Sequence, residues 1–517
     1  MKRELSWNLY SLGLIVLFSF FQIMQWPLLP KFLDTYYHLA VMKGFADAGG
    51  YVTHAFWEYA PAGRVHLYPP LLHVLMLLFY KLGFSPIGIA RLVDVVSYPA
   101  LLWALWHALS KIYSPKTAFI FLIVFSSVYS AYLSSVILTA FNLAFILSLF
   151  VFLNVQGEKP VAAGLWLGLC FYAHSFMGWL ALFTVVLYGF LDREVLRSAL
   201  KAALVGTLAA APMLIFQFLN RHAYAFIPLH ENRRLELDIF VYLLALGGLG
   251  FAFRKKGVYL FPVSLILGML PLVFTYRVRY LSGHGLVGFA LLATIFLEES
   301  GKWKAESGQR PIRFRSPLSA LRFPFLILTL LFFSFLAPVL RLDLKEKKWQ
   351  VLWHERTLTP YLMPQAVKSS HAQGFTIYFQ AEYEEIVKWI REYSAPDDLL
   401  WSDFAHAGGM LSVLAGRATS SSMLAEVRPA GARDPMRDAR VLVWFKNEKE
   451  EAPRGMGEAV QKYDLKLLAE TGFAYVFQNP RSTGKRNIPK PVLPEALLFA
   501  ILMGYGGFII IASAAKP

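Results

Sequence analysis

The sequence predicts an α-helical protein that crosses a membrane about twelve times and carries a small α/β domain near its C-terminus. Three observations predict this class. Of the 517 residues, 56% are hydrophobic and 16% are charged, and the mean hydropathy is +0.47, so the chain is more apolar than a soluble domain. Apolar stretches of membrane-spanning length recur along the first 340 residues. Residues 341–490 are much more polar, and a last apolar stretch follows them.

The apolar stretches define the predicted spans. The first follows the basic start Met1-Lys2-Arg3 and has no small-residue cleavage site, which predicts an uncleaved anchor. A further apolar run at 71–84 is short, and we place it within an outer loop. The predicted spans are 7–29, 87–110, 117–134, 141–155, 160–175, 177–191, 200–219, 236–253, 257–275, 283–298, 318–340 and 492–514.

The positions of lysine and arginine favour this topology. If residues 71–84 do not span, the inner loops carry about twice as many basic residues as the short outer loops, which is the usual bias. Both termini are then inside. Much of the net charge of +16 serves topology, so the sequence gives no reason to expect a nucleic-acid partner. The outer segments are 30–86, 134–142, 174–175, 221–235, 276–279 and 341–490.

The polar part reads as an outward-facing α/β domain. A helix is predicted at 382–393, and strands at 399–401 and 441–445. The predicted organisation is therefore a transmembrane domain at 1–340, the α/β domain at 341–490 and a C-terminal transmembrane helix at 491–517.

The first outer loop, 30–86, is the strongest candidate for a ligand site. Asp34-Thr35-Tyr36-Tyr37-His38 directly follows a span, where polar groups are costly to hold. The stretch 57–70 adds further acids, bases and aromatic rings and is pinned by prolines. The simpler alternative is that Asp34 caps a helix or pairs with Lys31. We expect this loop to bind a ligand at the membrane surface.

Basic residues on the same predicted face suggest an anionic ligand. Arg277 and Arg279 break the inner-side bias, and a guanidinium fits a phosphate well, although both could simply anchor the chain at the interface. Arg221 is a further candidate phosphate ligand, whereas His174 is interpreted as a packing histidine. The single cysteine, Cys170, excludes disulfides and a Cys-based metal site. No CxxC, HExxH, Walker or dinucleotide motif occurs.

These segments carry a resemblance to a known family. Asp34–His38, Trp57-Glu58-Tyr59-Ala60-Pro61-Ala62-Gly63-Arg64 and Tyr68-Pro69-Pro70 resemble the first outer loop of GT-C glycosyltransferases, most of all the catalytic subunit of oligosaccharyltransferase. In the polar part, Trp401-Ser402-Asp403-Phe404-Ala405 is similar to the WWDYG motif of that family, and Arg417-Ala418-Thr419 to the Arg-x-Thr that follows it. The likeness extends over the whole architecture.

Departures from the family pattern change the expected chemistry. Ser402 and Phe404 replace a tryptophan and a tyrosine of the motif that grips the sequon hydroxyl, so an Asn-sequon acceptor is not the first expectation. The turn 134–142 has no carboxylate, which argues against a metal held by two loops. Mg²⁺ or Mn²⁺ bound by Asp34 and Glu58 with the donor phosphate remains an alternative, and metal-independent action is favoured.

The resemblance implies an inverting transfer of a sugar from a polyprenyl-phosphate donor to a glycan or lipid hydroxyl on the extracytoplasmic face of the cell membrane, with Asp34 as general base. Protein acceptors through Asn sequons, a non-catalytic assembly protein and a lipid or sugar transporter are the alternatives. Membrane lipid is the remaining expected partner. The expected catalytic residues are Asp34 and Glu58. The expected donor-phosphate ligands are His38, Arg64, His66, Arg221, Arg277 and Arg279. The expected acceptor ligands are Tyr37, Trp57, Trp401 and Asp403.

Overall fold

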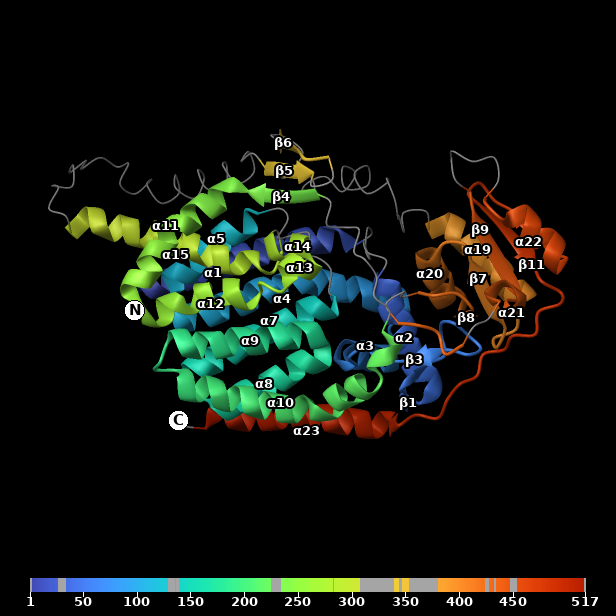
Figure 1. Ribbon diagram of the computed structural model, residues 1–517, viewed down its shortest axis with the longest axis horizontal. Helices are drawn as coiled ribbons and strands as arrows, with labels where there is room; N and C mark the ends of the chain where they lie inside the picture. Colours follow the sequence, from blue (N-terminus) through green and yellow to red (C-terminus); the bar gives the residue numbers. More distant parts are fainter. Residues whose placement is uncertain are drawn as a thin grey trace.

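The protein is a long helical bundle with an α/β domain at one end, as the computed structural model in Figure 1 shows. The helices run side by side, and the ends of the chain lie at the end of the bundle away from the α/β domain. This is the arrangement expected if both termini share one side of a membrane and the domain occupies the other. The structure describes residues 2–26, 34–128, 135, 139–224, 234–281, 283–306, 339–343, 346–352, 380–423, 427–431, 434–446 and 453–515.

The bundle is built from antiparallel apolar helices. Its long helices are α1 (Lys2–Met24), α4 (Pro86–Ile112), α5 (Pro115–Ser126), α7 (Ala140–Gln156), α8 (Pro160–Ala173), α9 (Ser175–Leu191), α10 (Leu196–Leu219), α11 (Ile239–Lys255), α15 (Leu286–Glu306) and α23 (Glu495–Ala514). Two shorter pieces are η2 (Arg221–Ala223) and α14 (Arg277–Leu281). Three more, η4 (Gly257–Leu260), α12 (Phe261–Gly268) and α13 (Leu272–Thr275), follow one another in an apolar segment that is long enough to cross a membrane.

Several helices begin at local sequence signals. Ser85 precedes α4 and Ser114 precedes α5, and each hydroxyl accepts a hydrogen bond from the backbone N–H three residues on. A proline follows each of these serines at the first helical position, where its missing N–H costs nothing. Thr139 caps α7 in the same way. These caps fix where the polar connections end and the apolar spans begin.

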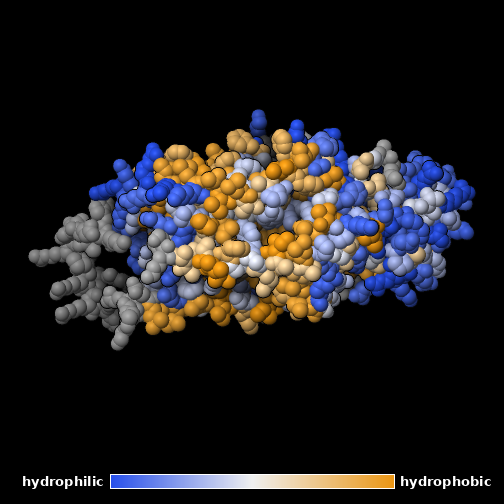
Figure 2. All heavy atoms as spheres, turned by 90° about the horizontal axis from the view of Figure 1, so that it is seen from below, coloured by the Kyte–Doolittle hydropathy of each residue, from blue (hydrophilic) through white to orange (hydrophobic). Residues whose placement is uncertain are grey.

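The surface of the bundle suits a membrane. Among the described residues, six helices are long and apolar enough to cross a bilayer, and five shorter apolar helices accompany them. Large apolar side chains on the outer helices point away from the protein, with Leu208 of α10 64% exposed and Ile510 of α23 71% exposed. Figure 2 shows apolar surface over the bundle and polar surface over the α/β domain. Such a large exposed apolar surface is stable only against lipid or another apolar surface.

The predicted outer loop folds as a compact unit between bundle and domain. It contains α2 (Asp34–Ala48), β1 (Gly50–Tyr51), β2 (His54–Ala55), β3 (Arg64–Val65) and α3 (Leu71–Lys81). With 11 residues, α3 is about 16 Å long, which is shorter than the ~30 Å apolar core of a bilayer. Its core includes Met410, Val413 and Met423 of the α/β domain, so loop and domain share one apolar core.

The α/β domain has a five-stranded mixed sheet in the order β10-β11-β9-β7-β8. Its strands are β7 (Leu399–Ser402), β8 (Ala418–Thr419), β9 (Val441–Phe445), β10 (Lys466–Glu470) and β11 (Ala474–Gln478). Its helices are α19 (Gln380–Tyr393), α20 (Ala405–Ala415), α21 (Pro435–Asp438) and α22 (Met456–Tyr463). After the domain, β12 (Leu493–Pro494) pairs with β1 of the outer loop and leads into α23.

A second sheet departs from the expected domain division. β4 (Arg234–Asp238) pairs with β5 (Val339–Asp343), which pairs with β6 (Lys348–Leu352). The predicted boundary at 341 falls inside β5, and the predicted span 236–253 begins in β4. Both strands alternate apolar and polar residues, which favours a sheet over a lipid-facing helix. Most of the predicted span 318–340 lies outside the described residues.

Candidate active site

Asp34, the predicted catalytic base, is the first residue of α2. Its side chain is half-buried, whereas Tyr37 and His38 are buried. Residues four apart lie on one face of a helix, so Asp34 and His38 share a face. A carboxylate at a helix N-terminus is also stabilised by the helix dipole, and this explains why the charge can be held there.

His38 is the centre of a buried polar cluster. Its Nδ1 lies 2.9 Å from Nε2 of His73 in α3, and its ring lies 5.4 Å from that of Tyr68. Burial lowers the pKa of His38 to about 4. The imidazole is therefore neutral at physiological pH, with one nitrogen as donor and the other as acceptor.

A line of rings connects this cluster to the arginine turn. Tyr68 lies 6.0 Å from His174, and His174 lies 5.2 Å from Phe141. The guanidinium carbon of Arg279 lies 4.7 Å from the centre of the Phe141 ring. His284 extends the line, with its ring 4.8 Å from Phe141. Segments far apart in the sequence thus bring Asp34, imidazoles and an arginine to one end of the bundle.

Hydrogen bonds hold the members of this line in place. His174 caps α9 by accepting the N–H of Met177. His284 Nε2 lies 3.2 Å from Oδ1 of Asn142, and the amide nitrogen of Asn142 donates to Ser97 at 2.6 Å. His174 is thus a hydrogen-bonded packing histidine, as the sequence suggested, and its ring also contacts Tyr68. His73 and His284 were not among the residues predicted from the sequence. For His284 a signal was present, because it lies between two glycines in Ser282-Gly283-His284-Gly285, next to Arg277 and Arg279.

The three arginines that the sequence predicts to face outward differ in their surroundings. Arg279 is half-buried between the rings of Phe141 and Tyr276. Arg277 is exposed and donates through Nε to the carbonyl of Val273 at 3.0 Å. Arg221 is exposed too, and its guanidinium packs on Phe218 of its own segment. Through its contact with Phe141, Arg279 joins the line of rings.

Glu58 and Arg64 form a fully buried ion pair. Arg64 Nη2 lies 2.6 Å from Glu58 Oε1, and both side chains have 0% exposure. The other carboxylate oxygen accepts the backbone N–H of Met423 in the α/β domain at 2.9 Å. Arg64 also donates to the hydroxyl of Tyr37 at 3.1 Å. The structure therefore uses these two predicted site residues to join the loop to the domain.

Trp57 and His66 are packed inside the outer loop. Their ring centres are 5.2 Å apart, and both side chains are buried. Trp57 lies so close to Gly44 of α2 that a Cβ there would be 2.2 Å from the indole, so only glycine fits. Burial, with the nearby Arg64 charge, lowers the pKa of His66 well below its usual value. The ring of His66 also lies 6.1 Å from that of His73, the partner of His38.

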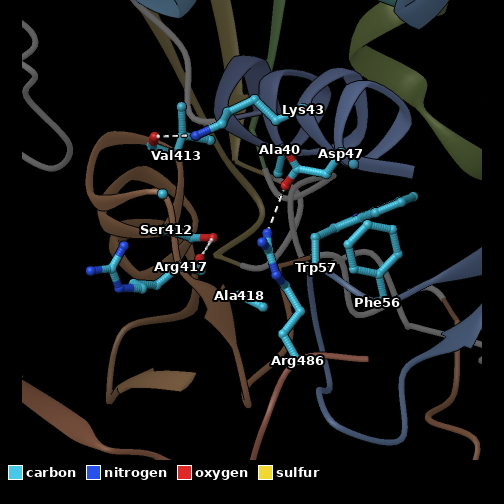
Figure 3. A pocket seen from close by; sticks show the side chains of 12 residues that line it. Ala40, Lys43, Asp47, Phe56, Trp57, Ser412, Val413, Arg417, Ala418 and Arg486 are labelled. Atoms are coloured by element: carbon cyan, nitrogen blue, oxygen red, sulfur yellow. Dashed lines mark hydrogen bonds and ion pairs between the residues drawn. The ribbon is translucent and has the colours of Figure 1, made fainter. Parts of the chain in front are cut away.

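Backbone and charged contacts fasten the domain to this loop. The N–H of Thr419 donates to the carbonyl of Trp57 at 2.9 Å, and the N–H of Ala60 donates to the carbonyl of Thr419 at 3.0 Å, which continues the sheet edge at β8 into the loop. On the far end of α2, Figure 3 shows Lys43 meeting the carbonyl of Val413 and Asp47 meeting Arg486. These contacts anchor the domain to the C-terminal part of α2 and to the loop that follows it.

The residues of the α/β domain that were expected to bind the acceptor make contacts within the domain. Trp401 is buried against Trp444, with ring centres 4.9 Å apart. Asp403 accepts the N–H of Phe445 at 3.2 Å, and the desolvation of its partly exposed carboxylate raises its pKa to about 6. Arg417 donates to the hydroxyl and carbonyl of Ser394. Trp401 and Asp403 therefore both have contacts within the α/β domain.

The side chains around Asp34 and Glu58 give little support to a metal site with two carboxylate ligands. Within the described ranges, no three His, Cys, Asp or Glu side chains gather as metal ligands. One oxygen of Glu58 pairs with Arg64, and the other accepts the backbone N–H of Met423. Glu58 is therefore a poor second carboxylate ligand for a metal bound at Asp34. No step below depends on a metal.

No family model and no curated protein sequence matches this chain. Solved structures do match its fold. Oligosaccharyltransferase from Archaeoglobus fulgidus, solved with Zn and sulfate, has 10% identity and a TM-score of 0.51, over 90% of this chain and 73% of that one. ArnT from Cupriavidus metallidurans has 14% identity and a TM-score of 0.56, over 91% and 98%. Arabinofuranosyltransferase AftD from Mycobacteria has 13% identity and a TM-score of 0.53, over 92% and 41%.

These three proteins are GT-C membrane glycosyltransferases. The chain therefore has the GT-C fold, with a multi-pass helical bundle and a small C-terminal sheet domain, as the sequence predicts.

Proposed function

We propose that the protein is a membrane glycosyltransferase that moves a sugar from a polyprenyl-phosphate donor to a hydroxyl of a glycan or lipid acceptor on the extracytoplasmic face. The observation that carries this proposal is the line of rings from the Asp34 helix to Arg279. The helix that begins at Asp34 lies at one end of this line and Arg279 at the other, which supports a site with a carboxylate and a cation. A lipid phosphate needs both an apolar path for its tail and a cation for its head.

The reaction is a single displacement. The acceptor oxygen forms a bond to the anomeric carbon, while the bond from that carbon to the phosphate oxygen breaks and the phosphate keeps the electron pair. Asp34 takes the proton of the acceptor hydroxyl. Attack from the face opposite the leaving phosphate inverts the anomeric configuration.

Arg279 would stabilise the leaving phosphate. Its guanidinium is held between two aromatic rings and is half-buried, where less water screens its charge. Charge grows on the phosphate as the bond breaks, so a fixed cation lowers the barrier. Two solved neighbours support a lipid-phosphate ligand: an Archaeoglobus fulgidus oligosaccharyltransferase structure contains a dolichol-phosphate, and an ArnT structure contains undecaprenyl phosphate.

The role given to Glu58 and Arg64 changes. Glu58 and Arg64 neutralise each other in a buried ion pair, so we assign them to holding the loop in place. Glu58 is no longer a catalytic candidate, and Arg64 is no longer a candidate phosphate ligand. Arg221 and Arg277 rank below Arg279 as phosphate ligands because both side chains are exposed, whereas Arg279 is half-buried between two rings.

Oligosaccharyl transfer to a sequon is the second candidate. It is favoured by the match to an Archaeoglobus fulgidus enzyme solved with a tethered acceptor peptide containing an NVT sequon. Against it, Trp401 is buried against Trp444, and the carboxylate of Asp403 already accepts the backbone N–H of Phe445. A hydroxyl acceptor therefore ranks first.

The test uses purified full-length protein in lipid nanodiscs with radiolabelled polyprenyl-phosphate sugars. We expect loss of the lipid-linked donor and appearance of a glycosylated product with inverted configuration. Arg279→Gln should lower the rate strongly. Arg277→Gln removes the same charge two residues earlier in the chain and should change the rate little. A transporter would move the donor intact, and an assembly protein would leave it unchanged; either result contradicts the proposal. Glycosylation of an Asn-x-Thr peptide, absent with its Gln-x-Thr control, would put the second candidate first.

A further inference from the structure

A small pocket lies where the outer loop meets the α/β domain. Its volume is about 20 Å³, and its lining comes from α2, from the loop at Phe56 and Trp57, from residues between 412 and 418 of the domain, and from Arg486. Arg486 belongs to the segment that leads from the domain to β12 and α23. A space of this size holds one body as large as a water molecule. An occupant would therefore lie between segments that are far apart in the sequence.

The charges that line this pocket are unbalanced. Lys43, Arg417 and Arg486 line it, and Asp47 is the one carboxylate among the lining residues that the structure describes. Asp47 accepts a hydrogen bond from Arg486 at 2.6 Å, so it compensates one of the three cations. Like charges repel strongly where water is scarce. The lining thus has an excess of two positive charges.

The charges just beyond the lining do not remove this excess. Asp397 and Asp398 lie on the domain side, and both pair with Lys485, at 3.2 and 2.8 Å. A further cation, Arg391, donates to the carbonyl of Leu414 at 2.6 Å. These four ionised side chains are two of each sign, so they leave the balance as it is.

The lining also has hydrogen-bond donors that lack a good acceptor. Lys43 Nζ is 3.4 Å from the carbonyl of Val413, which is long for an ammonium. Arg486 Nε and Trp57 Nε1 are buried, and neither has a hydrogen-bond partner among the described residues. Figure 3 shows the Arg486 guanidinium between α2 and the 412–418 segment of the domain. Buried donors without an acceptor are costly, so this lining favours an occupant that accepts hydrogen bonds.

We propose that the pocket binds a chloride ion, which fastens the α/β domain and the segment of Arg486 to the outer loop. A water molecule would accept hydrogen bonds but would leave the charge excess in place. Chloride is a pure acceptor, carries the opposite charge and is a single atom. Sulfate and phosphate, with four oxygens, need more room than one water molecule takes. This site lies apart from the transfer chemistry, and its role does not depend on the proposed reaction.

The first test measures the thermal unfolding midpoint of full-length protein while chloride replaces gluconate at constant ionic strength. Gluconate has the same charge but is too large for the pocket, and constant ionic strength keeps screening equal. We expect the midpoint to rise with chloride and to level off when the site is full, because a ligand of the folded state stabilises it by mass action. Bromide should act like chloride.

Two variants locate the effect. Lys43→Met should lose most of the chloride-dependent rise, whereas Lys388→Met, which removes an exposed lysine of α19, should keep it. Equal midpoints in chloride and gluconate, or a full chloride effect in Lys43→Met, would overturn the proposal.

The second test needs no variant and therefore decides the matter even if Lys43→Met does not fold. Crystals of the full-length protein grown in sodium bromide are measured at the bromine absorption edge. We expect an anomalous peak beside Lys43 and Arg486. Bromide peaks elsewhere on the protein but none in this pocket would show that water alone occupies it, and the proposal fails.

Discussion

Replacing Glu58 by Gln should destabilise the protein without touching the chemistry. Gln keeps the size of the side chain and can still accept the N–H of Met423, but it leaves the guanidinium of Arg64 buried without a counter-charge. Both side chains have 0% exposure, so water cannot compensate. Breaking one partner of such a buried pair costs about 3–5 kcal/mol.

The assay is the thermal unfolding midpoint of full-length protein in one detergent, with and without EDTA. We expect a clear drop in the midpoint for Glu58→Gln that EDTA does not change. Asp464→Asn is the matched control, because its ion pair with Arg481 is 63% and 70% exposed and contributes at most about 1 kcal/mol. Adding Arg64→Met to Glu58→Gln should recover part of the loss, since the uncompensated charge is then gone.

Two results would refute the reasoning. An unchanged midpoint for Glu58→Gln would show that the pair does not hold the loop to the domain. A stable Glu58→Gln protein that loses transfer, with a loss sensitive to EDTA, would return Glu58 to a metal-binding or catalytic role.

Three further predictions follow from the same structure. Asp34→Asn should lower transfer by about 10²–10⁴-fold, the range for loss of a general base, measured as donor consumed by folded protein; near-normal transfer would exclude the role. The raised pKa of Asp403 means that the folded state binds its proton more tightly, so its contribution to stability is complete below about pH 4 and is lost as the pH rises through about 6; Asp403→Asn should flatten this part of the stability profile, and an unchanged profile would contradict the shift. In a Cys170→Ala background, a cysteine at Lys388 of the domain should be labelled from outside the cell and one at Arg254 should not; the reverse would invert the topology.

The helical membrane class could be predicted from the sequence because it depends on local composition. A bilayer requires long apolar segments, and the caps at Ser85, Ser114 and Thr139 mark where several of them begin. The strand predicted at 441–445 coincides with β9, because a fully apolar run of five residues between polar segments suits a buried strand. The hairpin of β5 and β6 was missed because its partner, β4, lies about 100 residues earlier in the chain.

The sequence also determined that Asp34, His38 and Arg279 were worth testing, since polar groups beside a span are costly. It did not determine which charges are free. Glu58 and Arg64 look like site residues in the sequence, and only the tertiary structure shows that they neutralise each other and bind Met423, which is 365 positions away from Glu58. His73 lies in an apolar helix with no local signal, and it contacts His38 only because α2 packs against that helix. Local composition sets which segments are buried in lipid, but the pairing of charges depends on which segments the fold brings together.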